Sequence, residues 1–244
     1  MTEQRPRIGW IVDVQNDFML PPEQGGRLYV HDLFDGGKDP GARQIVPALV
    51  RTVEWMREHC HALLYTGDWH AITDEEIDPV APDAAKGTYP PHCMGLSADP
   101  AEREGAEIIA EVRPRDPVVV ARDAAETDAR EAARTALREG RPLFVQKLRF
   151  SVFEGNPATD ALLDELADVI GAAPEYVVCG VARDVCVKGA VEGMLERGLA
   201  VTLVTDATRG LGLETEAESL ARWTAAGLRT TRSAELSAAR REAA

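Results

Sequence analysis

Apolar runs with the length of a buried strand alternate with segments of helical periodicity along most of this 244-residue chain. The alternation is typical of β–α–β units, in which helices cover both faces of a parallel sheet. It predicts an α/β fold of the Rossmann-like kind, with three α/β/α layers and a mostly parallel sheet. The predicted strands are 7–13, 61–67, 142–147, 176–180, 200–206 and 228–231, and the predicted helices lie near 41–59, 157–171, 184–197 and 214–226.

The segment from about 120 to 141 carries one more helical pattern, ETDAREAARTALREG, which ends at Gly140. We interpret it as a helical insertion within a single domain that spans 1–244, because the chain shows neither an internal repeat nor a linker. The stretch 67–89 is acidic and too long for a plain connection between two elements. Loops of that length in compact domains are usually functional or mobile.

Composition narrows the class of protein. The formal net charge of −14 disfavours nucleic-acid and anionic-membrane partners by repulsion. No apolar run approaches the roughly 20 residues of a membrane helix, and no signal-peptide core is present, so we expect a cytoplasmic protein with a small-molecule partner. The four cysteines lack C-x-x-C spacing, which argues against structural disulfides, and Cys60 and Cys179 are expected to pack as small hydrophobes. The fold often self-associates, but no apolar stripe identifies a homo-oligomer interface.

Polar side chains follow four of the predicted strands at the point where each strand ends. They are Asp13, the pair Asp68 and His70, Lys147, and Cys186. In open parallel sheets ligands bind outside the carboxyl ends of the strands. Each residue alone has an ordinary structural explanation, such as a turn or a solvated lysine, but together they predict a site.

The cysteine of this set lies near the start of a predicted helix. The helix dipole and the unpaired N–H groups there are expected to lower the pKa of Cys186 and favour the nucleophilic thiolate. Asp13 can exchange a proton with the thiol or a leaving amine, and Lys147 can keep Asp13 ionised. The N–H groups of Ala182 and Cys186 can face a developing oxyanion. Asp184 is expected to cap the helix.

Asp68 and His70 are two residues apart on extended backbone and can therefore bind one ion from the same side. With His92 they form a carboxylate and two imidazoles, a set that suits zinc, iron or manganese. Glu76 has the spacing for a fourth ligand, although acidic loop residues are more often solvated. The alternative is a turn-capping aspartate beside an interfacial histidine.

The motifs IVDVQNDF, TGDWH, YPPHCMG and CGVARDVCVKGAV, with a lysine after a strand, occur in this order. In this they resemble the isochorismatase-like cysteine hydrolases, and most closely the nicotinamidase (pyrazinamidase) branch. The resemblance covers residues 8 to about 206, except for a poorly matching segment around 97–145. It implies the isochorismatase-like hydrolase fold.

The resemblance also implies roles for particular residues. It implies a cis peptide bond between Val181 and Ala182 that shapes the oxyanion hole. Phe150 and Phe153 are further candidates for lining the pocket. The implied roles are catalysis by Asp13, Lys147 and Cys186, an oxyanion hole from Ala182 and Cys186, metal binding by Asp68, His70 and His92, and substrate contact by Phe18, Tyr89, Val181 and Ala182.

The implied activity is that of a metal-assisted cysteine amidase that works through a thioester. The preferred substrate is nicotinamide, which gives nicotinate and ammonia in NAD salvage, and the preferred metal is zinc, with iron or manganese as alternatives. Three other functions stay open: an amidase for another small amide or carbamoyl compound, a mononuclear iron oxygenase that uses only the two-histidine, one-carboxylate cluster, and a non-catalytic ligand-binding member of the fold.

Overall fold

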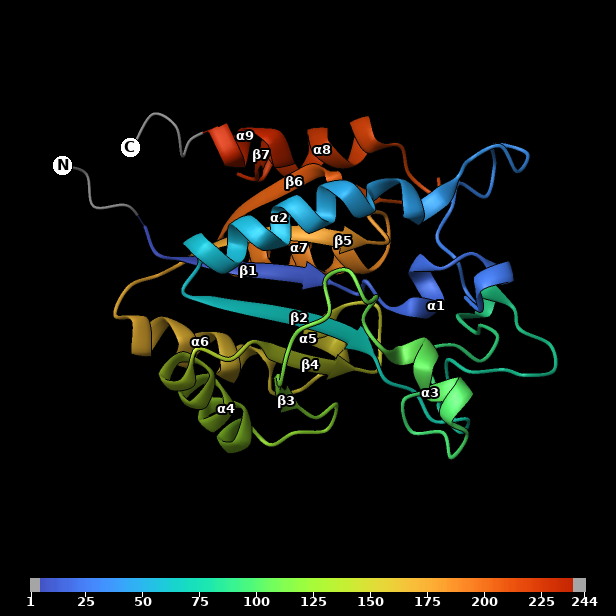
Figure 1. The fold of residues 1–244 in the computed structure, drawn as a ribbon, viewed down its shortest axis with the longest axis horizontal. Coiled ribbons are helices and arrows are strands. Elements are labelled where there is room, and N and C mark those ends of the chain that lie inside the picture. Colours follow the sequence, from blue (N-terminus) through green and yellow to red (C-terminus); the bar gives the residue numbers. More distant parts are fainter. Residues whose placement is uncertain (1–4, 239–244) are drawn as a thin grey trace.

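A seven-stranded parallel sheet forms the centre of the structure, a computed structural model that describes residues 5–238 (Figure 1). The strand order is β3-β4-β2-β1-β5-β6-β7, and every strand pair is parallel. The strands are β1 (Arg7–Val12), β2 (Ala62–Asp68), β3 (Val118–Val120), β4 (Leu143–Lys147), β5 (Glu175–Val181), β6 (Ala200–Arg209) and β7 (Arg229–Thr231).

Helices cover both faces of this sheet, which confirms the three-layer α/β/α fold. Helices α2 and α9 pack on one face, and α4, α6, α7 and α8 pack on the other (Figure 1). Among the described helices, none is both long and apolar enough to cross a bilayer. The helices are α1 (Asn16–Met19), α2 (Val46–His59), α3 (Pro100–Ala106), α4 (Glu126–Glu139), α5 (Val152–Gly155), α6 (Thr159–Ile170), α7 (Cys186–Glu196), α8 (Glu216–Ala225) and α9 (Ser233–Ala238).

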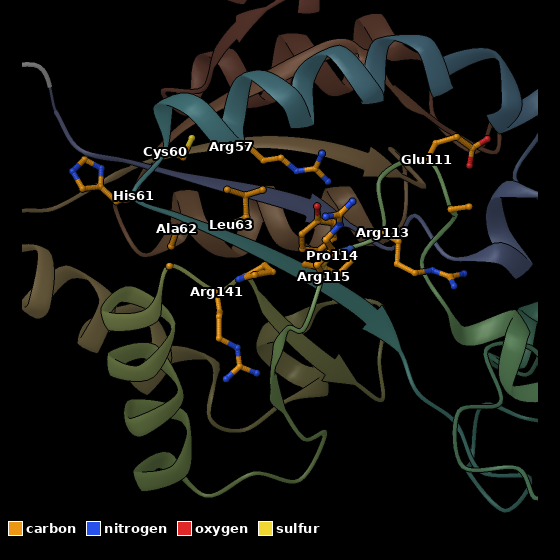
Figure 2. A pocket seen from close by; sticks show the side chains of 14 residues that line it. Arg57, Cys60, His61, Ala62, Leu63, Glu111, Arg113, Pro114, Arg115 and Arg141 are labelled. Carbon is orange, nitrogen blue, oxygen red and sulfur yellow. The ribbon is translucent and has the colours of Figure 1, made fainter.

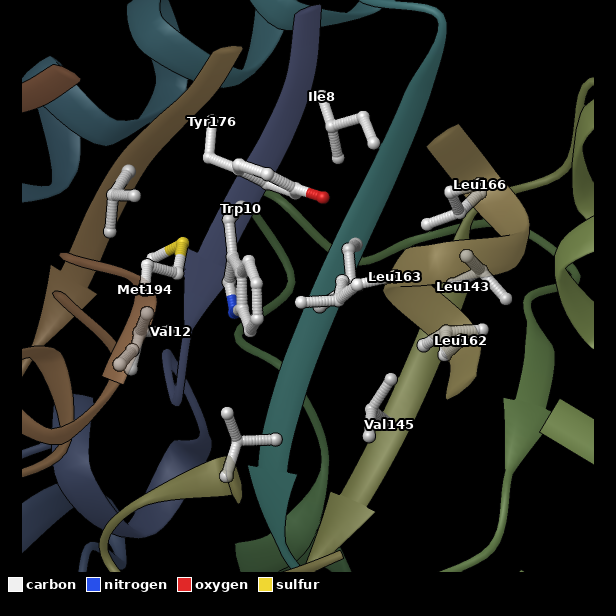
Figure 3. Close-up of a cluster of buried hydrophobic side chains, with 14 of the residues drawn as sticks. Ile8, Trp10, Val12, Leu143, Val145, Leu162, Leu163, Leu166, Tyr176 and Met194 are labelled. Carbon is white, nitrogen blue, oxygen red and sulfur yellow. The ribbon is translucent and has the colours of Figure 1, made fainter. Parts of the chain in front are cut away.

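The core divides into two clusters because successive side chains of a strand point to opposite faces of the sheet. Ile8, Trp10 and Val12 of β1 are buried in the cluster under α4, α6 and α7 (Figure 3), whereas Ile11 is buried in the cluster under α2. The Trp10 ring packs edge-on against Tyr176 of β5 at 5.8 Å. Because both faces are buried, the central strands are almost continuously apolar.

All of the predicted strands and helices are present, within a few residues of their expected bounds. The sequence did not predict the short edge strand β3 or the helices α1, α3, α5 and α9. The helix expected at 120–141 is α4, which ends at Gly140 in a left-handed conformation with φ 65°. It connects the edge strand β3 to β4, and these two strands pair in parallel. Its status as an insertion in a single 1–244 domain stays a prediction.

The four central strands end at the same edge of the sheet and bring the candidate residues together. Register places Val12 beside both Thr66 and Gly180, and it places Asp68 beside Lys147. Gly180 has a φ of 126°, a region that favours glycine, and a Cβ added there would lie 2.0 Å from the Val12 carbonyl oxygen. The carboxyl end of β5 can therefore approach β1 this closely only with glycine at position 180.

We expect Gly180→Ala to destabilise the protein by at least about 2 kcal/mol, since the added methyl group meets backbone that cannot rotate away. Gly140→Ala is the matched control, because Gly140 also has a positive φ but no atom lies within 4 Å of the position that a methyl group would take there. The control is expected to lose about 1 kcal/mol. Urea unfolding of both variants measures the difference, and equal losses would contradict the close approach as the cause.

Candidate functional site

Lys147, the last residue of β4, lies at the centre of the candidate site. Its side chain is 1% exposed. The ammonium nitrogen lies 2.9 Å from Asp13 Oδ2, donates to Asp68 Oδ1, and donates to the Arg149 carbonyl oxygen at 3.0 Å. The ammonium group therefore has two hydrogen-bond acceptors and one further ion-pair partner. Burial acts to lower the pKa of Lys147, but the two carboxylates outweigh it and raise that pKa well above its ordinary value, so the lysine stays charged.

Asp13 follows β1 directly and is buried. Its φ of 49° lies in the left-handed region, which is uncommon for a residue other than glycine. The Thr66 hydroxyl donates to Asp13 Oδ1 at 2.7 Å and leaves Oδ2 to Lys147. Burial raises the pKa of Asp13 above its ordinary value, although Lys147 acts in the opposite direction. Lys147 therefore favours the ionised carboxyl, as expected, but burial has the larger effect on its pKa.

Cys186 is the first residue of α7 and is 6% exposed. Its sulfur and one carboxylate oxygen each from Asp13 and Asp68 all lie within 4.8 Å of one another. Burial raises the pKa of the thiol well above its ordinary value, and the nearby carboxylates add to this, while Lys147 opposes it. The expected lowering of this pKa is wrong, because burial and two carboxylates raise it. The resting cysteine is therefore a thiol beside the carboxyl group of Asp13.

The turn between β5 and α7 has the implied cis peptide bond, between Val181 and Ala182. The backbone N–H groups of Ala182 and Cys186 donate to no other backbone group within residues 5–238, so both can serve a ligand. Both Val181 and Ala182 are buried. The expectation that Asp184 caps α7 is wrong, since its carboxylate instead accepts from the backbone N–H groups of Leu211 and Leu213.

Asp68, His70 and His92 come together as candidate metal ligands. One ligand atom from each lies within 4.8 Å of the other two, and all three residues are buried. His92 Nδ1 contacts the Pro90 carbonyl oxygen at 2.8 Å, which requires a proton on Nδ1 and leaves the Nε2 lone pair free. His70 Nε2 is buried and has no hydrogen-bond partner in the described part of the chain. Such a nitrogen is expected where a ligand completes its bonding.

The charges at this cluster also fit a bound cation. Burial lowers the pKa of both His70 and His92, so both imidazoles are neutral and able to bind metal. Burial acts to raise the pKa of Asp68, but Lys147 and the two histidines outweigh it and lower that pKa, so Asp68 is a carboxylate. One carboxylate and two neutral imidazoles are the donors that zinc, iron and manganese accept.

Sequence reasoning missed the residues that orient these ligands. The Gln15 side chain donates to the Asp68 carbonyl oxygen and accepts from the Asp68 N–H, both at 2.8 Å. Asp74 Oδ2 lies 3.4 Å from His70 Nδ1 and also accepts from Arg122, which donates to the Trp69 carbonyl oxygen at 2.9 Å. Gln15 lies inside a quoted motif, so its position was a usable signal, whereas nothing in the sequence pointed to Arg122.

Aromatic side chains lie beside His92, one of the three candidate metal ligands. The Phe18 and Tyr89 rings lie 5.6 and 6.2 Å from the His92 ring, and the Phe150 ring lies 5.5 Å from Tyr89. Phe153 instead packs against Trp10, at 6.2 Å, in the core. Of the two additional phenylalanine candidates, only Phe150 lies beside the site.

Glu76 is the one buried carboxyl of residues 73–78, at 4% exposed, and its Oε1 has no hydrogen-bond partner among the described residues. It lies outside the group of Asp68, His70 and His92, whose ligand atoms are within 4.8 Å of one another. Burial, with a smaller contribution from Asp68, raises the pKa of Glu76 to about 8. A role for Glu76 as a fourth ligand stays a prediction.

This raised pKa makes the contribution of Glu76 to stability depend on pH. The ordinary value is 4.5, so between pH 4.5 and about 8 the folded state binds more protons than the unfolded state. Stability therefore falls as the pH rises through that range. We expect Glu76→Gln in metal-free protein to remove this loss and to stabilise the fold by on the order of 3 kcal/mol more at pH 7.5 than at pH 5.

Urea unfolding at the two pH values measures this difference. Glu75→Gln is the matched control, because Glu75 is an exposed neighbour that pairs with Arg149 at the surface. The same pH-dependent gain in both variants would rule out burial of Glu76 as its origin.

Solved structures of similar fold include two named as amidases. The pyrazinamidase of Pyrococcus horikoshii in complex with zinc matches with a TM-score of 0.60 and 22% sequence identity, over 93% of this chain and 98% of that chain. The N-carbamoylsarcosine amidase from Thermoplasma acidophilum matches with a TM-score of 0.60 and 21% sequence identity, over 93% of this chain and 96% of that chain. These similarities show the fold.

Residues 106–235 match the isochorismatase domain family, and this match spans more than half of the chain. The chain therefore belongs to the isochorismatase family and is a hydrolase. It is also 25% identical over 219 residues to the nicotinamidase of Escherichia coli (strain K12), a match that covers 86% of this chain and 85% of that protein.

Proposed function

We propose that this hydrolase is a metal-assisted cysteine amidase that converts nicotinamide to nicotinate and ammonia. The observation that carries the proposal is the convergence of Asp13, Lys147 and Cys186 beside the Asp68, His70 and His92 cluster. A thiol suited to act as nucleophile, a carboxyl suited to carry a proton and a charged lysine lie next to donors that could hold a cation. The similarity to a nicotinamidase supports the choice of substrate.

The first half of the reaction begins with the protonated cysteine. As Cys186 Sγ bonds to the carboxamide carbon, the thiol proton passes to Asp13, and the raised pKa of that carboxyl favours its uptake. The N–H groups of Ala182 and Cys186 stabilise the negative oxygen of the tetrahedral intermediate. Asp13 then gives its proton to the amine, the carbon–nitrogen bond breaks, and ammonia leaves a thioester on Cys186.

The second half reverses these roles. Asp13, now ionised, removes a proton from a water molecule that attacks the thioester carbon. The carbon–sulfur bond breaks, the acid is released, and the proton returns through Asp13 to the cysteine sulfur. Lys147 stays charged throughout. Its positive charge reduces the repulsion between the carboxylates of Asp13 and Asp68 whenever both are ionised.

Asp68, His70 and His92 would hold the cation, and we propose zinc, consistent with the zinc complex of the pyrazinamidase of similar fold. A divalent ion bound there supplies an electrophilic contact that orients a nitrogen or oxygen atom of the substrate. The aromatic rings of Phe18 and Tyr89 flank His92 and suit a flat ring on the same side. We propose that they contact the substrate, together with the backbone at Val181 and Ala182.

A second candidate function is that of an amidase for a small carbamoyl compound. It is supported by the N-carbamoylsarcosine amidase, which matches the fold with the same TM-score as the pyrazinamidase. Membership of a hydrolase family favours neither the iron oxygenase nor the non-catalytic alternative. The cytoplasmic location and the absence of nucleic-acid and membrane partners stay predictions.

Ammonia release from nicotinamide tests the reaction and the nucleophile together. We expect the zinc-loaded protein to release ammonia and Cys186→Ala to lose at least about 10³-fold in kcat with its zinc content unchanged. Cys60→Ala is the matched control and should keep its activity, because Cys60 lies at the amino end of β2, away from the site. Retained activity in Cys186→Ala would overturn the mechanism.

A panel of simple amides and carbamoyl compounds, assayed with and without a chelator, separates substrate from mechanism. Loss of nicotinamide turnover on chelation, restored by zinc, supports the metal's role. Hydrolysis of a carbamoyl compound in preference to nicotinamide would replace the proposed substrate but retain the thioester chemistry.

The contacts of Arg122 predict an effect on metal binding. Arg122 holds Asp74 against His70, so Arg122→Gln should weaken zinc binding about 10- to 100-fold, while excess zinc restores most of the activity. Competition with a chromogenic chelator measures the affinity. Arg138→Gln, at an exposed position on α4, is the control. Zinc affinity equal to that of the control would show that this contact does not orient His70.

A further inference from the structure

A cavity of about 730 Å³ lies over the amino-terminal half of β2, at the opposite end of this strand from Asp68 (Figure 2). Its volume is in the range of small-molecule sites. Three parts of the chain line it: the end of α2 with the start of β2, the segment 110–115, and the turn before β4. The lining residues are Arg57, Cys60, His61, Ala62, Leu63, Tyr65, Ala110, Glu111, Arg113, Pro114, Arg115, Gly140, Arg141 and Pro142.

The charge of this lining is opposite to that of the whole chain. Arg57, Arg113, Arg115 and Arg141 contribute four guanidinium groups, and Glu111 is the one acidic residue of the lining. Glu111 is paired with Arg43, outside the cavity, at 2.9 Å. A chain with a net charge of −14 repels anions in general, so a basic cavity on it marks one place where an anion can bind.

Three of these arginines have no carboxylate partner among residues 5–238. Arg113 Nε donates to the Ile108 carbonyl oxygen at 2.8 Å, which fixes the side chain but leaves its terminal nitrogens unused. Arg57 interacts with the Tyr65 hydroxyl, and Arg115 makes neither an ion pair nor a hydrogen bond in the described part of the chain. Arg141 differs, because it is paired with Asp116 and Glu139, each at 3.1 Å.

Guanidinium groups that share a cavity without carboxylates repel one another, and a bound anion offsets this electrostatic repulsion. The planar fork of arginine matches the oxygens of a phosphate group. Leu63 and Pro114 add apolar surface to the same lining, against which an organic group can pack. Several phosphate oxygens joined to an organic group would therefore use both kinds of surface.

We propose that this cavity binds a compound that carries a diphosphate group, with Arg57, Arg113 and Arg115 on the phosphates. The site is separate from Cys186 and the metal-ligand cluster, and its occupancy does not depend on amide hydrolysis. The diphosphate could be that of a nucleotide or free pyrophosphate, and the two are distinguished by experiment.

Isothermal titration calorimetry of the full-length, zinc-loaded protein with inorganic pyrophosphate and, separately, with ADP tests the proposal. We expect saturable binding of at least one probe with one site per chain, weakening as the salt concentration rises. Tighter binding of ADP assigns the nucleotide, and tighter binding of pyrophosphate assigns the free anion. Zinc content measured after each titration identifies any heat that comes from removal of the metal.

Arg57→Gln and Arg115→Gln should each weaken this binding about tenfold, because each removes a charged contact to phosphate. Both variants should keep the wild-type thermal midpoint and amidase activity. Arg232→Gln, an exposed arginine after β7 at the far edge of the sheet, is the matched control and should bind as wild type does. Absence of saturable binding to both probes, or binding unchanged in both cavity variants, would overturn the proposal.

Discussion

The buried ammonium of Lys147, shared between Asp13 and Asp68, is the interaction on which the rest of the site depends. Two carboxylates this close and this deeply buried could not both stay ionised without a cation between them. By joining them, Lys147 connects two chemically different halves of the site. In the proposed mechanism, Asp13 belongs to the half that exchanges the thiol proton, and Asp68 belongs to the half that would bind a cation.

This connection explains why the pKa values of the two carboxyl groups move in opposite directions. Asp68 has Lys147 and two imidazoles around it, and its pKa is lowered. Asp13 shares the same lysine but lies beside Asp68 and has no imidazole contact, so burial prevails and its pKa is raised. These opposite directions fit the proposed roles, in which Asp68 is a ligand that stays a carboxylate and Asp13 is a base that exchanges protons.

Much of the fold and the set of central site residues could be predicted from the sequence. The alternation of strands and helices indicated the parallel three-layer architecture, and its strand ends placed Asp13, Asp68, Lys147 and Cys186 at one edge. These predictions succeeded because a buried parallel strand must be apolar and its first polar residue marks its end. The direction of the Cys186 pKa could not be predicted, because burial and neighbouring charges depend on the assembled fold.

Residues that act through another residue also could not be predicted from the sequence. Arg122 reaches His70 through Asp74, and no periodicity or motif connects Arg122 to the other two. The expected cap at Asp184 was wrong for a similar reason. A local rule assigned its carboxylate to the next helix, but a distant loop at 211–213 supplies N–H donors in the folded protein.

The order of strands in the sheet has a consequence for how the site responds to local unfolding. Its principal groups lie at or just after the carboxyl ends of β4, β2, β1 and β5, which are four adjacent strands of the sheet, whereas β3 and β7 at the edges contain none of them. Edge strands open more readily than central ones, so fraying there leaves the spacing between the nucleophile and the ligand cluster intact. As a consequence, no contiguous fragment shorter than residues 13–186 contains the whole set. The site can form only after β1 has paired with β5, a strand far from it in the sequence.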